Sequence, residues 1–169
     1  MKDHLKSRPG TYALLLALDA PVELEIGRLG QIHFESPYYM YVGSAFGPGG
    51  LQARICHHTQ PVRHSHWHID YLRQVADVVG VWFSADHVGF ECVWANAALA
   101  VRGASQVPRF GSSDCRCQSH LVAVSRLPSV AAFRRRLNVL QGGCAPIRQL
   151  YIPIKQCTRS IHTFSEGTS

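Results

Sequence analysis

The chain has 169 residues, 46% of them hydrophobic, and its 17 Lys and Arg residues outnumber its 11 Asp and Glu residues, which gives a formal net charge of +6. This length and apolar content predict one folded domain with a real core. No apolar run is long enough for a membrane helix, and the first ten residues, MKDHLKSRPG, lack the apolar stretch of a signal peptide, so we expect a cytoplasmic protein that does not enter a membrane. The positive charge favours a polyanionic partner such as nucleic acid, with a mildly basic enzyme as the alternative.

The first half of the chain predicts strands, a hairpin and two helices. The apolar run from Tyr12 to Leu18 has the length of a buried strand, and YYMYVG continues as another after Pro37. Between them, apolar and polar residues alternate over 22–26 and again over 32–34, which predicts a half-exposed β-hairpin. Helical spacing then predicts a helix over 50–59 and an amphipathic helix in HSHWHIDYLRQVAD, with one apolar face made by Ile69, Leu72, Val75 and Ala76.

In the second half, strands are predicted over 78–83 and about 121–124, and a helix over 90–101. The segment 103–120 is rich in Gly, Pro and Ser and is predicted to be a loop that could carry chemistry. Ser129 is a candidate N-cap for a basic helix that includes Arg134, Arg135 and Arg136.

Histidines and cysteines suggest metal binding or acid–base chemistry. Five histidines lie between His57 and His68, and His66 with Asp70 has the i, i+4 spacing of a histidine oriented by a carboxylate, against the simpler alternative of a cap or a surface salt link. Cys115, Cys117 and His120 supply three of the four ligands of a closed zinc site, for which Cys92 or a histidine of the 57–68 segment could be the fourth. The alternative is a loop that packs reduced thiols; Asp114 beside it is a further candidate site residue.

Several motifs occur in a fixed order along the chain. They are GTY (10–12), YVGSA (41–45), GGL (49–51) followed by Arg54, HWHIDYL (66–72), Glu91-Cys92, and GSSDCRC (111–117) followed by SHL (119–121). In this combination the chain resembles the GIY-YIG nuclease superfamily. It looks most like a domain-of-unknown-function branch that occurs alone or attached to endonuclease III, and the match runs from about residue 10 to 124.

The resemblance implies an α+β fold in which helices flank a small central antiparallel sheet, here with the hairpin as an insertion. We accordingly expect a lead over 1–9, a nuclease-like domain over 10–125, a basic helix over 126–143 and a partly disordered tail over 144–169.

The resemblance also implies a phosphodiester nuclease that uses one divalent metal ion, Mg²⁺ or Mn²⁺. Carried over residue by residue, Tyr12 and Tyr41 line the site, Arg54 holds phosphate, Glu91 ligates the metal, and His58 falls where the superfamily often has His or Tyr. A single carboxylate is an adequate protein anchor for Mg²⁺, which keeps most of its waters. A phenol would accept a proton from water only if nearby positive charge lowered its pKa.

Other observations leave rival functions open. Ser44 stands where many superfamily members have a basic residue, and outside this context the tyrosines would be packing residues and Glu91 a favourable charge at a helix start. The expected nucleic-acid contacts are Arg54, His57, Ser44, Arg134 and Arg135, with DNA preferred to RNA, although the arginine run fits a solvated helix face equally well. The leading hypothesis is a DNA endonuclease that acts in repair. The alternatives are a non-catalytic nucleic-acid-binding module on the same fold and, more weakly, a zinc-stabilised interaction domain.

Overall fold

The computed structural model describes residues 7–113, 115–141 and 146–151, and a six-stranded antiparallel sheet forms the centre of this part. The strand order is β6-β7-β4-β1-β5-β8, and β2 and β3 form a separate two-stranded hairpin. The strands are β1 (Gly10–Ala17), β2 (Val22–Glu25), β3 (Gln31–Phe34), β4 (Tyr38–Ser44), β5 (Asp77–Ala85), β6 (Ser105–Gln106), β7 (Leu121–Val124) and β8 (Arg148–Tyr151). The helices are α1 (Gly50–Thr59), α2 (His68–Leu72), α3 (Glu91–Leu99) and α4 (Val130–Gln141). The predicted α+β class, central antiparallel sheet and inserted hairpin are therefore confirmed.

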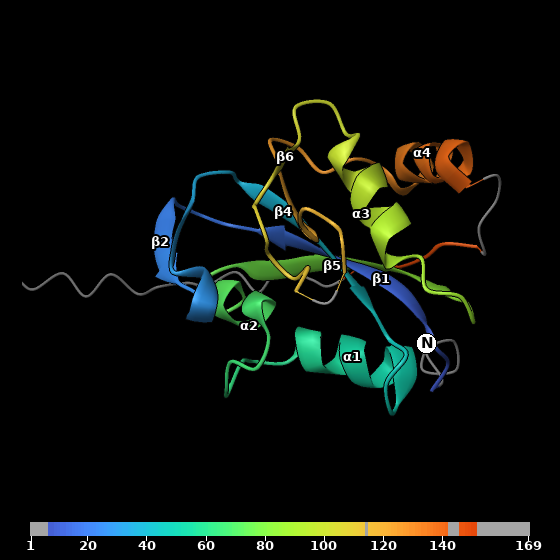
Figure 1. Ribbon diagram of the computed structural model, residues 1–169, viewed down its shortest axis with the longest axis horizontal. Helices are drawn as coiled ribbons and strands as arrows, with labels where there is room; N and C mark the ends of the chain where they lie inside the picture. Colours follow the sequence, from blue (N-terminus) through green and yellow to red (C-terminus); the bar gives the residue numbers. More distant parts are fainter. Residues whose placement is uncertain (1–6, 114, 142–145, 152–169) are drawn as a thin grey trace, which may run out of the picture.

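The central strand β1 alternates between the two faces of the sheet, and each face has its own core. Tyr12, Leu14 and Leu16 contribute to one core, with side chains from α1, α2 and the hairpin. Ala13 and Leu15 contribute to the other, with side chains from α3 and α4. Figure 1 shows the same arrangement, with α1 and α2 below the sheet and α3 and α4 above it. The fold is thus a sheet between two helical layers. Successive side chains of β1 point to opposite faces of the sheet and are apolar on both, so each face needs a layer of helices to cover it.

The upper layer contains an aromatic cluster that fixes the C-terminal helix. The Phe133 ring of α4 lies 5.0 Å from the ring of Trp82 on β5 and 5.5 Å from that of Trp94 on α3. Ser129 caps this helix as predicted, because its hydroxyl oxygen accepts a hydrogen bond of 3.2 Å from the backbone N–H of Ala132. Phe133 and Leu137 are fully buried, so α4 is an integral part of the layer.

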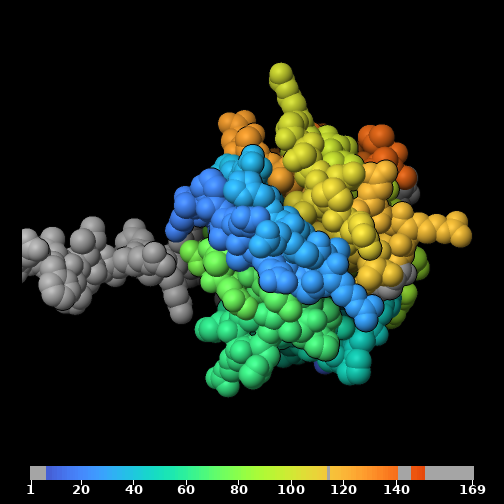
Figure 2. Space-filling model, turned by 60° about the vertical axis from the view of Figure 1, so that its left-hand side comes forward, coloured from blue at the N-terminus to red at the C-terminus, as the bar shows by residue number. Residues whose placement is uncertain are grey.

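The hairpin closes one end of the lower core. Phe34 of β3 is fully buried and its ring lies 6.3 Å from that of Phe110, in the segment that leads to β7. In Figure 2 the hairpin, in blue, lies between the green segment around α2 and the yellow to gold segment around residues 100–120. The insertion therefore has a packing role: it covers apolar surface next to the 103–120 segment.

Two predicted elements differ from the structure. The single amphipathic helix expected around Ile69 is the five-residue α2, after which the chain turns to enter β5 at Asp77, and Val75 is 44% exposed. The helix begins only at His68 because the Asp70 carboxylate accepts hydrogen bonds from the backbone N–H groups of His66 and Trp67. The 103–120 segment, expected to be a loop throughout, contains the short edge strand β6.

The structure describes only part of the two terminal segments of the chain. The strand β8 uses the first residue of the apolar patch predicted near the C-terminus, whereas residues 152–169, most of the expected tail, lie outside the described residues, as do 1–6 and 142–145. In the part that the structure describes, no helix is long and apolar enough to span a membrane.

Candidate functional site

A polar pocket of about 290 Å³ lies at the end of β1 and β4, on the sheet face that α1 and α2 cover. Six residues predicted from the sequence as site residues line it, five of them from four different helices and strands and one from the segment before α2: Tyr12, Tyr41, Ser44, Arg54, Glu91 and His66. Trp67, His68, Gly111 and Ser113 complete its wall, with Gly43. Segments from distant parts of the chain thus bring cationic, anionic and phenolic side chains to one cavity.

The register of β1 and β4 explains why the two tyrosine–glycine motifs meet. Tyr12 lies opposite Gly43, and Tyr41 is two residues from Gly43 along β4, so both phenols are on the same face of the sheet. A Cβ atom at Gly43 would collide with the hydroxyl group and ring of Tyr12. The glycine of YVG is therefore required by the tyrosine of GTY, whose side chain lies across its backbone.

Gly111 has a comparable relation to Tyr41. Its φ of 69° is in the left-handed region that glycine adopts readily, and a Cβ there would lie 2.9 Å from Cε2 of Tyr41. Consequently the loop before β7 can approach the second tyrosine closely, and it forms one wall of the pocket.

Below the pocket, Tyr12 and His58 form a buried pair. The Tyr12 hydroxyl and Nε2 of His58 share a hydrogen bond of 2.8 Å, and the two side chains are nearly inaccessible to solvent. Burial lowers the pKa of His58 to about 3, and burial, reinforced by the neighbouring Tyr41, raises the pKa of Tyr12 well above its ordinary value. At neutral pH the pair is therefore an uncharged imidazole and an uncharged phenol.

Arg54 is positioned by the HWHIDYL segment. Its guanidinium carbon lies 4.4 Å from the centre of the Trp67 ring, a cation–π contact that holds the side chain beside the cavity. Because Arg54 is on α1 and Trp67 directly precedes α2, this contact also joins the two short helices.

Asp70 is the buried centre of a polar network beneath these residues. Its Oδ2 accepts hydrogen bonds of 3.0 Å from the backbone N–H groups of His66 and Trp67, and its Oδ1 is 3.0 Å from Nη1 of Arg73 and 3.1 Å from Nε2 of His57. Burial raises the pKa of Asp70, but the two backbone donors and His57 outweigh it, so the pKa lies below its ordinary value. The network holds the Trp67 backbone, and with it the cation–π contact to Arg54.

This network decides between two interpretations of the i, i+4 spacing of His66 and Asp70, a side-chain pair or a helix cap. Asp70 acts as the cap and accepts the backbone N–H of His66, and the imidazole that contacts Asp70 is that of His57. The spacing argument assumed a helix at residue 66, whereas α2 begins at residue 68. His57, the predicted nucleic-acid contact, is exposed and has Nε2 3.1 Å from the buried carboxylate, while His66 lines the pocket.

Glu91, the first residue of α3, enters the pocket beside His120. Its Oε1 lies 3.0 Å from Nδ1 of His120. The Glu91 side chain is 24% exposed to solvent, whereas the His120 side chain is only 1% exposed. Burial lowers the pKa of His120, but the Glu91 carboxylate and the Cys115 thiol outweigh it, so the pKa is raised. On its other side, Nε2 of His120 lies 3.3 Å from Sγ of Cys115.

The remaining predicted residues lie elsewhere. Cys115, Cys117 and His120 do come together, with Cys92 beside them. Arg134 and Arg135 are on α4 in the opposite helical layer and do not line the pocket, and Arg134 donates a hydrogen bond of 3.2 Å to the carbonyl of Ile147. Asp114 lies outside the described residues.

Three side chains of the pocket wall were not among the candidate site residues, namely those of Trp67, His68 and Ser113. Two of them belong to HWHIDYL and the third to GSSDCRC, so the motifs contained the signal. It was missed because the helical pattern of residues 66–76 suggested an apolar face, and nothing local shows that Trp67 packs on an arginine of α1.

The fold and the pocket define an α+β protein whose central antiparallel sheet carries a polar cavity at the end of two adjacent strands. A family model described as "Domain of unknown function DUF123" matches residues 11–140, and the chain belongs to this family. No curated protein matches the chain, and no solved structure does.

Proposed function

We propose that the protein is a divalent-metal-dependent endonuclease of the GIY-YIG type that hydrolyses phosphodiester bonds in DNA, with repair as its context. One observation carries the proposal. Tyr12, Tyr41, Arg54 and Glu91, the four residues that the resemblance implies for the site, come from β1, β4, α1 and α3 and line one pocket. Residues with only packing roles would have no reason to converge on a single polar cavity.

Arg54 suits the phosphate-binding role. A guanidinium presents a planar fork of donors that matches two phosphate oxygens, and the cation–π contact with Trp67 holds the guanidinium beside the pocket before substrate binds. Preorganised positive charge of this kind stabilises the charge that develops on phosphoryl oxygens during hydrolysis. The net charge of +6 would attract the polyanionic backbone.

Glu91 fits a divalent cation. Its carboxylate has two oxygens, and since His120 contacts Oε1, the same group could reach a cation without giving up its orientation. Bound Mg²⁺ or Mn²⁺ would supply a more acidic water and neutralise phosphate charge. The protein's own part is to hold Glu91, Arg54 and the substrate phosphate in a fixed relation.

The Tyr12–His58 pair supports a positioning role for Tyr12. Because burial raises the pKa of Tyr12 and lowers that of His58, neither group readily takes a proton from water. Nε2 of His58 instead fixes the direction of the phenol hydroxyl.

The second candidate is a nucleic-acid-binding module that keeps this fold without hydrolysis. The raised pKa of Tyr12, together with Ser44 at the pocket position where the resemblance implies a basic group, favours this alternative. Both candidates expect binding that weakens steeply with added salt, because phosphate neutralisation releases counterions.

The test is cleavage of labelled duplex, branched and single-stranded DNA, with matched RNA, in Mg²⁺ or Mn²⁺. Glu91→Gln keeps the size of the side chain and removes its charge, and Glu23→Gln, on the exposed hairpin, is the matched control. We expect metal-dependent cutting by the wild type and the control, and a loss of about 100-fold or more in Glu91→Gln.

The outcomes separate the candidates. Salt-sensitive binding without cutting in any metal would replace the nuclease with the binding module. Equal cutting by Glu91→Gln and the wild type would remove Glu91 from the site and with it the proposed mechanism.

A further inference from the structure

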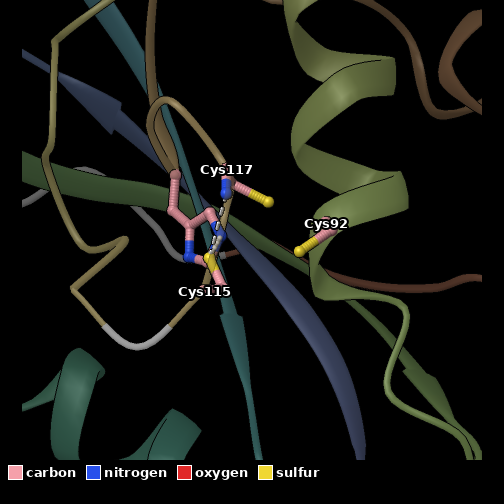
Figure 3. A group of neighbouring side chains, drawn as sticks. Cys92, Cys115 and Cys117 are labelled. Carbon is pink, nitrogen blue, oxygen red and sulfur yellow. Dashed lines mark hydrogen bonds between the residues drawn. The ribbon is translucent and has the colours of Figure 1, made fainter.

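A second cluster of reactive side chains lies behind the pocket and takes no part in the proposed hydrolysis. Cys92 is on α3, Cys115 and Cys117 are in the loop before β7, and His120 directly precedes β7. One Sγ atom from each cysteine and one ring nitrogen of the histidine all lie within 4.8 Å of one another. Figure 3 shows the sulfur atoms of the three labelled cysteines turned toward a common point, from the helix on one side and the loop on the other.

The spacing and the donor types fit a tetrahedral metal ion. Zinc binds thiolate sulfur at about 2.3 Å and imidazole nitrogen at about 2.0–2.1 Å, so the ligand atoms of a tetrahedral site lie roughly 3.5–3.8 Å apart. The four ligand atoms of the cluster lie within 4.8 Å of one another, so movements of about 1 Å or less would bring them to this spacing. One pair, Nε2 of His120 and Sγ of Cys115, is already 3.3 Å apart. Three thiolates and one imidazole form a closed structural zinc site, and such soft ligands do not suit Mg²⁺.

The groups around the cluster match the surroundings of a metal site. The backbone N–H of Cys117 donates a hydrogen bond of 3.4 Å to Sγ of Cys115, which stabilises a thiolate. Nδ1 of His120 lies 3.0 Å from a carboxylate oxygen of Glu91. A histidine ligand commonly donates its second ring N–H to a carboxylate, which fixes both the tautomer and the plane of the ring.

A disulfide explains the arrangement less well. A disulfide would involve two of the sulfur atoms and would not explain why the third thiol and the buried imidazole lie beside them, whereas one metal ion would bind all four groups. All three cysteines are free thiols in the structure.

We propose that Cys92, Cys115, Cys117 and His120 bind one Zn²⁺ ion, which fastens the loop before β7 to the start of α3. This loop supplies Gly111 and Ser113 to the pocket wall, and His120 contacts Glu91, so the ion would shape the pocket from behind. The proposal does not depend on nuclease activity, because its readout is the metal itself.

The experiment measures the metal content of the full chain, purified without chelator and then exposed to Zn²⁺ and passed through a desalting column. We expect one zinc per chain in the wild type and in the control Cys56→Ser, whose cysteine is exposed on α1 outside the cluster. Cys92→Ser and Cys117→Ser should each retain less than about a tenth of that zinc, since a site with three ligands binds far more weakly.

A second measurement does not depend on how the variants fold. Wild-type protein stripped of metal and loaded with Co²⁺ should show the intense visible bands of tetrahedral cobalt and the ultraviolet charge-transfer bands of cobalt thiolates, both displaced by added Zn²⁺. Absence of these bands, retention of zinc by both cluster variants, or a native Cys92–Cys117 disulfide found by mass spectrometry would each overturn the proposal.

Discussion

Replacement of Asp70 by Asn tests the network that holds the Arg54–Trp67 contact in place. Asp70 is fully buried, and the side chain of its partner Arg73 keeps only 4% of its exposure. Asparagine has almost the same shape and retains one oxygen that can accept the backbone N–H groups of His66 and Trp67. What it removes is the negative charge, which leaves the Arg73 guanidinium buried without a counter-ion.

The expected cost follows from that geometry. Breaking a buried ion pair by removing one partner costs about 3–5 kcal/mol, because the remaining charge stays desolvated. Since Asn keeps part of the hydrogen bonding, we expect the free energy of unfolding to fall by about 3 kcal/mol, the lower end of this range. That is a large fraction of the roughly 5–15 kcal/mol typical of a domain.

Urea unfolding followed by tryptophan fluorescence measures the effect, and a fall of about 1–3 M in the midpoint is expected. The control is Asp77→Asn, an exposed position at the start of β5, which should change stability by less than about 0.5 kcal/mol. Adding Arg73→Met to Asp70→Asn should recover part of the loss, because it removes the orphaned charge. A loss below about 1 kcal/mol in Asp70→Asn, or no recovery in the double variant, would refute the assignment of the cost to a buried charge.

Two further predictions concern the Tyr12 side of the pocket. Gly43→Ala should lower the free energy of unfolding, measured in urea, by about 1–3 kcal/mol, because the added Cβ would collide with Tyr12. The control Gly89→Ala should be nearly neutral, since the nearest atom to its added Cβ is in the Phe46 ring, at 3.5 Å. Equal effects of the two substitutions would contradict the close approach of Tyr12 to Gly43. Between pH 6.5 and about 3 the unfolded chain protonates His58 and the folded chain does not, so the free energy of unfolding should fall as the pH falls, by up to about 1.4 kcal/mol per pH unit from this group. His58→Gln should flatten that slope, and an unchanged slope would show that His58 titrates normally.

The sequence predicted the sheet and its helices well where periodicity is local. The helix over 50–59 has the predicted ends, and the alternation over 22–34 is the hairpin. Periodicity failed around residue 69, where an apolar stripe of helical spacing belongs to one short helix and the turn after it. A side chain explains the late start of this helix, because the Asp70 carboxylate accepts hydrogen bonds from the backbone N–H groups of His66 and Trp67. The strand β6 has only two residues and depends on β7 for its hydrogen bonds, so no local pattern could predict it.

For the site, the motifs indicated which residues line the pocket, but they did not predict how these residues interact. Tyr12, Tyr41, Arg54 and Glu91 were found through the resemblance, yet the Tyr12–His58 hydrogen bond and the Glu91–His120 contact join residues far apart in the chain. Such contacts follow from strand register and from the packing of two helical layers, which single-chain spacing does not encode. The same reasoning left the fourth partner of the cysteine cluster open between Cys92 and a histidine, because only the placement of α3 beside the 111–120 loop decides it.

The adjacency of Glu91 and Cys92 has a consequence for how metal dependence is interpreted. Successive helix residues point about 100° apart, so the first turn of α3 can present Glu91 to the pocket and Cys92 to the cysteine cluster. If both proposals hold, a chelator would abolish cleavage for two reasons, by removing the catalytic cation and by releasing the loop that carries Gly111 and Ser113. Loss of activity in chelator therefore does not identify a catalytic metal. Activity that Mg²⁺ alone restores after mild chelation, while the zinc content stays at one per chain, would assign catalysis to the Glu91 side of the helix. Activity that returns only when Zn²⁺ is also added would show that the cluster shapes the pocket from behind.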